Sequence, residues 1–148
     1  MITRKNLGND VEICELDCTV GEYVVDVKLV KDEGYIVEAV LYFRSGRRLH
    51  IYHCQDCCED VILIDIVGGS LDGLVGQEIK SIKSVSKNSD ERLISSVKGY
   101  LNDSNTWTFV TISTFKDDIT LRWHGNSNGY YSEEVDFAYY DEDNNRLL

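Results

Sequence analysis

Apolar and polar residues alternate along much of this chain, with the period of two that a strand shows when one face packs against a core. Between Tyr23 and Val30, for example, Val25, Val27 and Leu29 alternate with Asp26 and Lys28. Proline, which interrupts strand pairing, is absent. The predicted strands span residues 11–18, 23–30, 35–43, 47–54, 61–67, 77–87, 106–114, 118–124 and 135–140.

Short strands separated by glycine and asparagine turns predict a mainly β fold, an antiparallel sandwich or barrel-like sheet, in a single domain over residues 1–148. Asp32-Glu33-Gly34 and Ser45-Gly46 are typical hairpin turns, and the glycine-rich connection 68–76 has room for one helical turn. One or two short helices are expected, at Asp56–Glu59 and within Asp90–Val97. The predicted core includes Val27, Leu41, Leu63, Ile66, Phe109, Leu121 and Phe137.

Charge excludes several classes of partner. The chain carries 26 acidic and 15 basic residues, a formal net charge of -11, which opposes direct binding to nucleic acid or to an anionic membrane. The charge can serve solubility alone, or it can complement a basic partner through the acidic, aromatic segment 133–143. No apolar run approaches a membrane span, and the first residues lack a signal peptide. Five cysteines, an odd count, favour reduced thiols, so we expect a cytoplasmic protein.

A first polar cluster, His50–Glu59, contains candidate chemistry. Asp56 and Glu59 have the spacing of a capping box, which would place Cys57 at the start of a helical turn, where the thiol pKa is lowered. Cys57 with His53 is therefore the candidate catalytic pair, although buried and inert cysteines are the commoner outcome. Cys54-x-x-Cys57 has the spacing of half a zinc site, and Cys14-x-x-x-Cys18 could supply the second pair, but the flanking glycines are missing. We expect no metal and no cofactor.

A second polar cluster, Arg122–Glu133, combines turn residues with aromatic ones. Asn126-Ser127-Asn128-Gly129 is turn chemistry, but the surrounding tryptophans and tyrosines suit a planar ligand or a protein hot spot. Binding is favoured over catalysis here, since no acid–base pair is present. We expect the two clusters to meet in space, with Gln55, Asp56 and Glu59 near Ser127, Asn128 and Tyr130. The predicted binding residues are Gln55, Asp56, Glu59, Trp107, Arg122, Trp123, Ser127, Asn128, Tyr130 and Tyr131.

The two clusters also carry a resemblance. Three segments are similar to a small domain family of unknown function from bacteria, prophages and phages. They are His53-Cys54-Gln55-Asp56-Cys57-Cys58-Glu59, Thr106-Trp107-Thr108-Phe109 and Arg122-Trp123-x-Gly125-x-Ser127-Asn128-Gly129-Tyr130-Tyr131-Ser132. The resemblance covers about residues 42–137. It implies a cytoplasmic protein associated with mobile elements, and it implies no activity.

Two hypotheses of function follow. In the first, the chain is a small acidic binding protein, associated with phage or prophage, that captures a basic host protein or a small planar signalling ligand and could thereby act against host defence. In the second, it is a thiol-dependent enzyme that uses Cys57 with a neighbouring histidine.

Overall fold

The computed structural model describes residues 4–7, 11–14, 16–89 and 104–148, which contain ten strands and two short 3-10 turns. The strands are β1 (Arg4–Leu7), β2 (Val11–Cys14), β3 (Val24–Asp32), β4 (Tyr35–Phe43), β5 (Arg48–Tyr52), β6 (Asp60–Val67), β7 (Ser81–Ser89), β8 (Ser104–Ser113), β9 (Asp118–Ser127) and β10 (Asp136–Tyr140). The 3-10 turns are η1 (Leu16–Thr19) and η2 (Leu71–Leu74).

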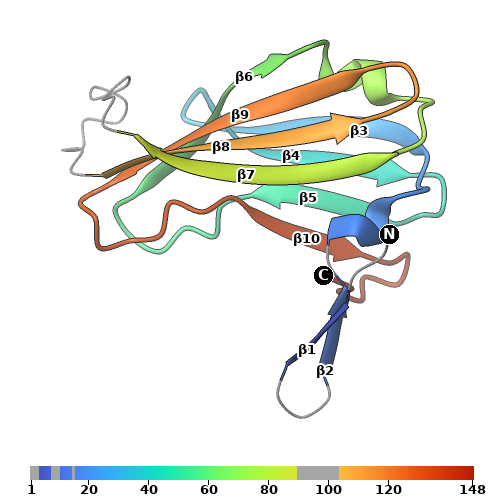
Figure 1. Cartoon of the computed structure of the whole chain (residues 1–148), viewed down its shortest axis with the longest axis horizontal. Helices are drawn as coiled ribbons and strands as arrows, with labels where there is room; N and C mark the ends of the chain where they lie inside the picture. The colour runs from blue at the N-terminus through green and yellow to red at the C-terminus, as the bar shows by residue number, and fades with distance from the viewer. Residues whose placement is uncertain (1–3, 8–10, 15, 90–103) are drawn as a thin grey trace.

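Eight of these strands form one antiparallel sheet. Its order is β10-β5-β4-β6-β9-β8-β7, and β3 pairs with β4, while β1 and β2 pair only with each other. The sheet curls like half a barrel, so that β9, β8 and β7 lie in front of β3 and β4 in Figure 1. The predicted mainly β, antiparallel fold is therefore confirmed.

The β3–β4 hairpin shows how local sequence sets this topology. Glu33 and Gly34 join the two strands with positive φ angles of 51° and 85°. Two successive residues with positive φ are what a tight hairpin turn needs to match the twist of its strands. The strand predicted over 35–43 is β4, end to end.

The core lies between the two halves of the curled sheet. On β5, Leu49 and Ile51 are fully buried while Arg48, His50 and Tyr52 face the other side, as the alternation predicts. Of the predicted core residues, Leu41, Leu63 and Leu121 are buried, and Val27, Ile66 and Phe137 pack against the core with part of their surface exposed.

The prediction for Phe109 is wrong. Phe109 lies on the outer face of β8, where its ring stacks on Trp107 with 6.2 Å between the centroids. Val110, next along the strand, takes the core position instead and is fully buried. A period-two pattern shows that side chains alternate between the two faces of a strand. When both faces carry apolar residues, however, the pattern does not show which face is turned to the core.

The helix predicted at Asp56–Glu59 is also wrong. The chain bends at Cys57 and Cys58, and β6 begins at Asp60, so no helical turn fits between them. The helical turn foreseen in the glycine-rich connection is confirmed as η2, where the Ser70 side chain accepts a hydrogen bond from the Gly73 N–H. The helix predicted within 90–97 lies outside the described residues.

Candidate functional site

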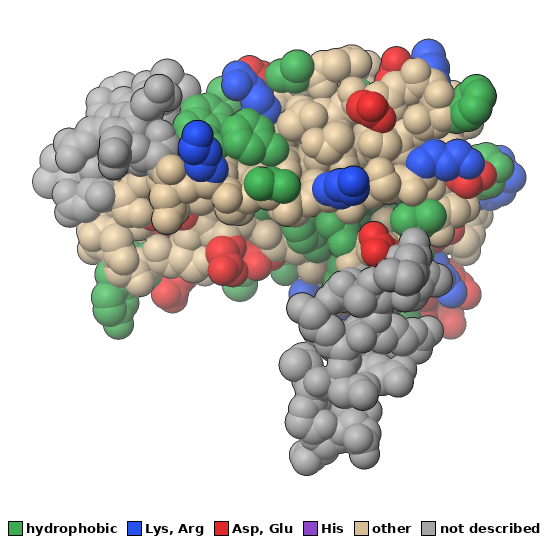
Figure 2. Space-filling model, viewed as in Figure 1, with side chains coloured by type: hydrophobic (Ala, Val, Ile, Leu, Met, Phe, Trp, Pro, Cys, Tyr) green, Lys and Arg blue, Asp and Glu red, His purple; other side chains and the backbone are tan. Residues whose placement is uncertain are grey.

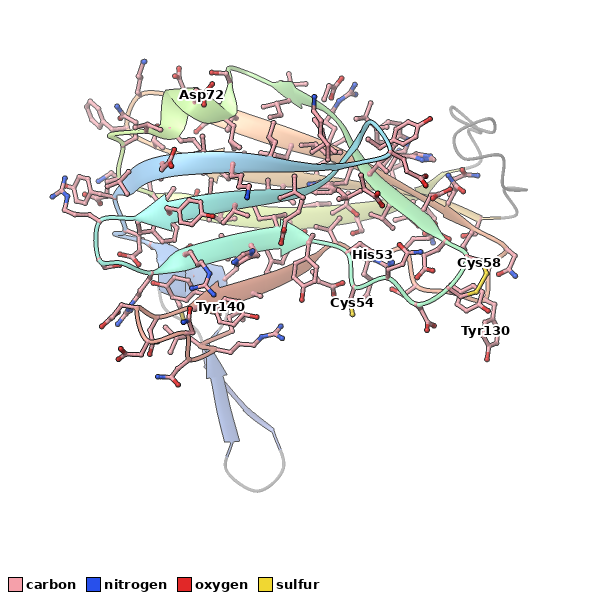
Figure 3. The ribbon with its side chains drawn as sticks, turned by 180° about the vertical axis from the view of Figure 1, so that it is seen from behind. His53, Cys54, Cys58, Asp72, Tyr130 and Tyr140 are labelled. Atoms are coloured by element: carbon pink, nitrogen blue, oxygen red, sulfur yellow. A yellow bond between two sulfur atoms is a disulfide. The ribbon has the colours of Figure 1, made fainter. Side chains whose placement is uncertain are left out.

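The two polar clusters lie at the same end of the sheet. β6 begins where the first cluster ends, β9 runs into the second, and Asp60 of β6 is paired with Asn126 of β9. Figure 3 shows His53, Cys58 and Tyr130 together at this end, away from Asp72 and Tyr140. The coarser expectation, that the two clusters lie at the same end of the fold, is therefore confirmed.

The carboxylate of Glu59 organises the first cluster. One carboxylate oxygen accepts hydrogen bonds from the Cys57 N–H at 2.8 Å and the Gln55 amide at 3.1 Å, and the other accepts from the Asp56 N–H at 3.1 Å. Gln55 also donates to the Glu59 carbonyl at 2.7 Å. Glu59 is only 1% exposed, so this buried carboxylate holds the loop 54–59 to the end of β6.

Burial and hydrogen bonding shift the pKa of Glu59 in opposite directions. Desolvation raises the pKa of a buried carboxyl group, but the hydrogen bonds from His53 and from the backbone outweigh it and lower the pKa of Glu59 to about 2. Glu59 therefore keeps its charge while it is buried.

His53 is held between two acceptors. Its Nε2 lies 2.9 Å from a carboxylate oxygen of Glu59, and its Nδ1 lies 2.6 Å from the Glu134 carbonyl. Neither a carboxylate nor a carbonyl oxygen can donate, so each hydrogen bond forms only when the ring nitrogen that faces it carries a proton. The pair of His53 and Glu59 is buried, with side chains that are 3% and 0% exposed.

The cysteines of the first cluster differ from expectation. Cys57 and Cys58 are joined in a disulfide, Cys18 is disulfide-bonded too, and Cys54 is an exposed free thiol. Reduced thiols were expected, and that expectation is wrong at these positions. With its sulfur bonded to Cys58 and both nitrogens of His53 engaged, Cys57 is not arranged as a thiolate beside a free base.

In the second cluster, a serine and a glutamate pair inside the fold. Ser127 donates to a carboxylate oxygen of Glu133 at 2.5 Å and accepts from the Gly129 N–H at 3.0 Å. Gly125 leaves the room that this requires, because a Cβ at this position would lie 2.7 Å from the Glu133 Cβ. Ser127 and Glu133 are both buried, so they anchor the loop 127–133 and are not available to a partner.

Alternation places other residues of the second cluster on the outer face of β8 and β9. Arg122 lies 5.5 Å over the Trp107 ring and forms a two-pronged ion pair with Asp65, while His124 meets the same ring edge-on at 4.8 Å. Figure 2 shows hydrophobic side chains flanked by lysine and arginine on this face. His124 is fully buried, neither ring nitrogen has a hydrogen-bond partner in the described part of the chain, and desolvation lowers its pKa.

The ten predicted binding residues therefore do not form one pocket. Trp123 is fully buried in the core, and Glu59 and Ser127 are internal anchors. Trp107 and Arg122 share the outer face of the sheet. The surface loops hold Asp56, Asn128, Tyr130 and Tyr131, of which Tyr130 is 83% exposed.

An acidic cleft that the sequence analysis missed opens beside Gln55 and His53. Its volume is about 750 Å³, and it lies between the β3–β4 turn, the end of β5 and the start of β6. The sequence pattern predicts Glu38 only as part of an apolar strand and Asp32-Glu33 only as part of a turn. A carboxylate inside the otherwise apolar run 35–43 was the signal that could have drawn attention to it. The lining residues are Asp32, Glu33, Tyr35, Val37, Glu38, Tyr52, His53, Gln55 and Val61.

Glu38 links this cleft to the outer face of β5. Its carboxylate lies 2.9 Å from the His50 Nδ1, and the His50 Nε2 accepts a hydrogen bond from Arg48 at 2.9 Å. Arg48 in turn donates to the Asn144 side chain at 2.8 Å. This chain of bonds fixes the orientation of Glu38 at the cleft wall, so the carboxylate is positioned before any partner arrives.

Neither a metal centre nor a membrane span is found in the described residues. No group of three or more histidine, cysteine or acidic side chains there is arranged to hold a metal ion. None of the helical segments in the same residues has the length and hydrophobicity to cross a membrane.

Comparison with known proteins identifies a family. The family described as a domain of unknown function (DUF7448) matches residues 14–137, so the chain belongs to this family. No curated protein and no solved structure matches the chain significantly.

Proposed function

We propose that this DUF7448 protein is a binding protein whose acidic cleft receives a positively charged segment of a partner protein. The observation that carries the proposal is the charge of the cleft. Three carboxylates, those of Asp32, Glu33 and Glu38, line it, and no lysine or arginine is among its described lining residues.

The rest of the cleft suits a cation with an apolar stem. Tyr35, Val37 and Tyr52 add aromatic and aliphatic surface beside the carboxylates, and the long side chains of lysine and arginine bury their methylene groups against such surface. His53 is already paired with Glu59 at 2.9 Å, so it does not offset the three carboxylates. The net charge of -11 would speed the approach of a basic partner.

A finer form of the proposal adds a biological setting. On the resemblance to phage and prophage proteins, the partner would be a basic protein of a bacterial host, captured in the cytoplasm, and capture could act against host defence. The thiol-enzyme alternative gains no support from the geometry, since Cys57 is bonded to Cys58 and His53 has no free ring nitrogen.

The test uses a fluorescein-labelled nona-arginine peptide as probe, with binding followed by fluorescence anisotropy at low and physiological salt. The cleft variant carries Asp32→Asn, Glu33→Gln and Glu38→Gln together. We expect it to bind about tenfold more weakly than the wild type, from roughly 0.5 kcal/mol for each exposed charge pair. Affinity for the wild type should fall as salt rises, because screening weakens charge pairs at the surface.

A matched variant separates the cleft from the overall charge. Asp118→Asn, Glu142→Gln and Asp143→Asn also remove three negative charges, at exposed positions outside the cleft lining. We expect its affinity to stay within about twofold of the wild type, since only the long-range field changes. Equal losses in the two variants would mean that the probe senses net charge and not the cleft, and the proposal would then be wrong.

A further inference from the structure

Cys57 and Cys58 form a disulfide that joins two neighbouring residues on the loop between β5 and β6 (Figure 3). A disulfide stabilises a fold mainly by tying together distant parts of the chain, and the effect grows with the number of residues that it encloses. This bond joins adjacent residues, so it holds no separate segments of the fold together. Its constraint acts on the loop itself, at the peptide group between the two cysteines.

A reductant in solution can reach this disulfide. Cys57 and Cys58 are both exposed, whereas Glu59, the next residue, is buried. Thiolates break disulfides by direct attack on a sulfur atom, so exposed disulfides are the ones that exchange readily and serve regulatory or catalytic roles. The bond is therefore placed for thiol–disulfide exchange, and its position gives it little part in the stability of the core.

The backbone of Cys57 supports one wall of the acidic cleft. Its N–H donates to a carboxylate oxygen of Glu59 at 2.8 Å, and its carbonyl accepts from the Gln55 side chain at 3.3 Å. The same Gln55 amide donates to the Glu59 carbonyl at 2.7 Å, and Glu59 lies 2.9 Å from the His53 Nε2. Gln55 and His53 both line the cleft. Freedom gained by the peptide groups of Cys57 would therefore pass directly to two lining residues.

The buried charge of Glu59 depends on the same loop. Desolvation raises the pKa of its carboxyl group, but hydrogen bonds outweigh this effect and lower the pKa to about 2. Two of the donors are backbone N–H groups of the loop, those of Asp56 and Cys57. A loop that moves more freely offers these donors for only part of the time, and the buried carboxylate is then less well compensated.

We propose that the Cys57–Cys58 disulfide is a reversible redox site opened by a dithiol reductant, and that its state sets how firmly the loop 54–59 holds this wall of the cleft. A thiolate of the reductant attacks one of the two sulfurs, the bond between the cysteines breaks, and the other sulfur leaves as a thiolate that takes a proton. The second thiol of the reductant then displaces the attached cysteine. The reductant ends as a disulfide and the protein as two thiols. The effect on the cleft rests on the proposed function.

The test compares the oxidised and the reduced protein, with Cys54→Ser in every sample so that the exposed free thiol of this loop takes no part in exchange. Cys54 is not a lining residue of the cleft. Alkylation followed by peptide mass spectrometry reports the state of the bond. We expect dithiothreitol to open it without change in the far-ultraviolet circular dichroism spectrum, and glutathione disulfide to close it again. A bond that stays closed in dithiothreitol, or a chain that unfolds when it opens, would overturn the proposal.

Amide hydrogen exchange, followed by NMR, measures the order of the loop. The Asp56 and Cys57 amides bond to the carboxylate of Glu59 and should exchange roughly fivefold faster after reduction, as expected for the loss of one hydrogen bond. The matched control is the Asn145 amide, which also bonds to a carboxylate, that of Asp141, and should be unchanged. Equal exchange of the loop amides in the two states would overturn the proposal.

The affinity for nona-arginine reports the effect on the cleft. We expect the reduced protein to bind about threefold more weakly, because the peptide must then order the loop as it binds. By reciprocity, saturating peptide should lower the reduction potential of the cysteine pair by about 14 mV. A variant with Cys57→Ser and Cys58→Ser should bind like the reduced protein, with or without dithiothreitol. A response of this variant to dithiothreitol as large as that of the oxidised protein would assign the effect to the disulfide of Cys18 and would overturn the proposal.

The two proposals can fail separately. Equal losses in the two charge variants would contradict the proposed function, and amide exchange would still decide whether the disulfide controls the loop. Unchanged amide exchange would contradict the redox site and leave binding at the cleft untouched. Where the cleft variant shows that the peptide binds in the cleft, equal affinity of the oxidised and reduced protein would overturn the control of the cleft by the disulfide.

Discussion

Replacement of Glu59 by glutamine would test the buried ion pair that holds the first polar cluster together. Glutamine has nearly the same shape, but it exchanges one acceptor oxygen for an NH₂ group. At either position that group would face a donor already present: the Cys57 N–H and the Gln55 amide in place of one oxygen, or the Asp56 N–H in place of the other. The change also removes the carboxylate with which the buried His53 ring is paired.

Two lines of reasoning give the size of the effect. The pKa of Glu59 is about 2 against an ordinary value of 4.5. At about 1.4 kcal/mol per pKa unit, this difference corresponds to about 3 kcal/mol of stability at neutral pH. Removal of one partner from a buried ion pair typically costs about 3–5 kcal/mol. We therefore expect the free energy of unfolding to fall by roughly 3 kcal/mol.

The pH dependence gives a second and more specific readout. A carboxyl group with a lowered pKa stabilises the folded state fully above its unfolded pKa, and this contribution is lost as the pH falls. For Glu59 the loss runs from about pH 4.5 toward pH 2. The stability difference between wild type and Glu59→Gln should therefore be constant from pH 7 to pH 5 and shrink below that range.

Urea unfolding followed by tryptophan fluorescence, at several pH values, measures both quantities. Glu134→Gln is the matched control, because it is the same substitution near the same loop at an exposed side chain. The control should change stability by less than about 0.5 kcal/mol. A loss below about 1 kcal/mol for Glu59→Gln, or a loss that persists undiminished at pH 2, would refute the ion pair described here.

Three other predictions concern the same end of the sheet. Gly125→Ala should destabilise the fold by about 1–3 kcal/mol in thermal unfolding, because its Cβ would crowd the Cβ of Glu133 at 2.7 Å. The wild type should lose stability as the pH falls below 6.5, since desolvation lowers the pKa of His124, and His124→Leu should show a flatter profile in urea unfolding. Alkylation of the unreduced protein followed by peptide mass spectrometry should label Cys54 and spare Cys57–Cys58, which should become labelled after reduction.

Periodicity was enough to predict most of the strands and not enough to predict their faces. A strand over residues 35–43 could be predicted because nearly all of its residues are apolar, as in a buried strand, and this strand is β4. Phe109 was misplaced because β8 carries large apolar residues on both sides, and only its pairing with β9 shows that Trp107 and Phe109 lie outside. Pairing between distant strands is a non-local property that no window of sequence contains.

The candidate site, like the strands, could be predicted from the sequence only in part. The meeting of the two polar clusters followed from their positions at strand ends, which pairing of β6 with β9 then brings together. Their roles did not follow, because burial decides them. Glu59 and Ser127 look like surface residues in the sequence, yet they bond inward to His53 and Glu133. The acidic cleft combines residues from three separate segments, so nothing short of the fold could assemble it.

The buried pair of His53 and Glu59 connects the stability of the loop with the charge of the cleft. His53 lines the cleft, and its ring lies 2.9 Å from Glu59 and 3.9 Å from Asp136. Loss of the Glu59 charge would remove a negative charge from behind the wall of a site that we propose to bind cations. Glu59→Gln, measured under conditions where it remains folded, should therefore bind nona-arginine more weakly than the wild type, although Glu59 itself is 1% exposed and touches no partner. Unchanged affinity in the folded variant would mean that the cleft does not sense the Glu59 charge and that the basic segment binds at its outer carboxylates alone.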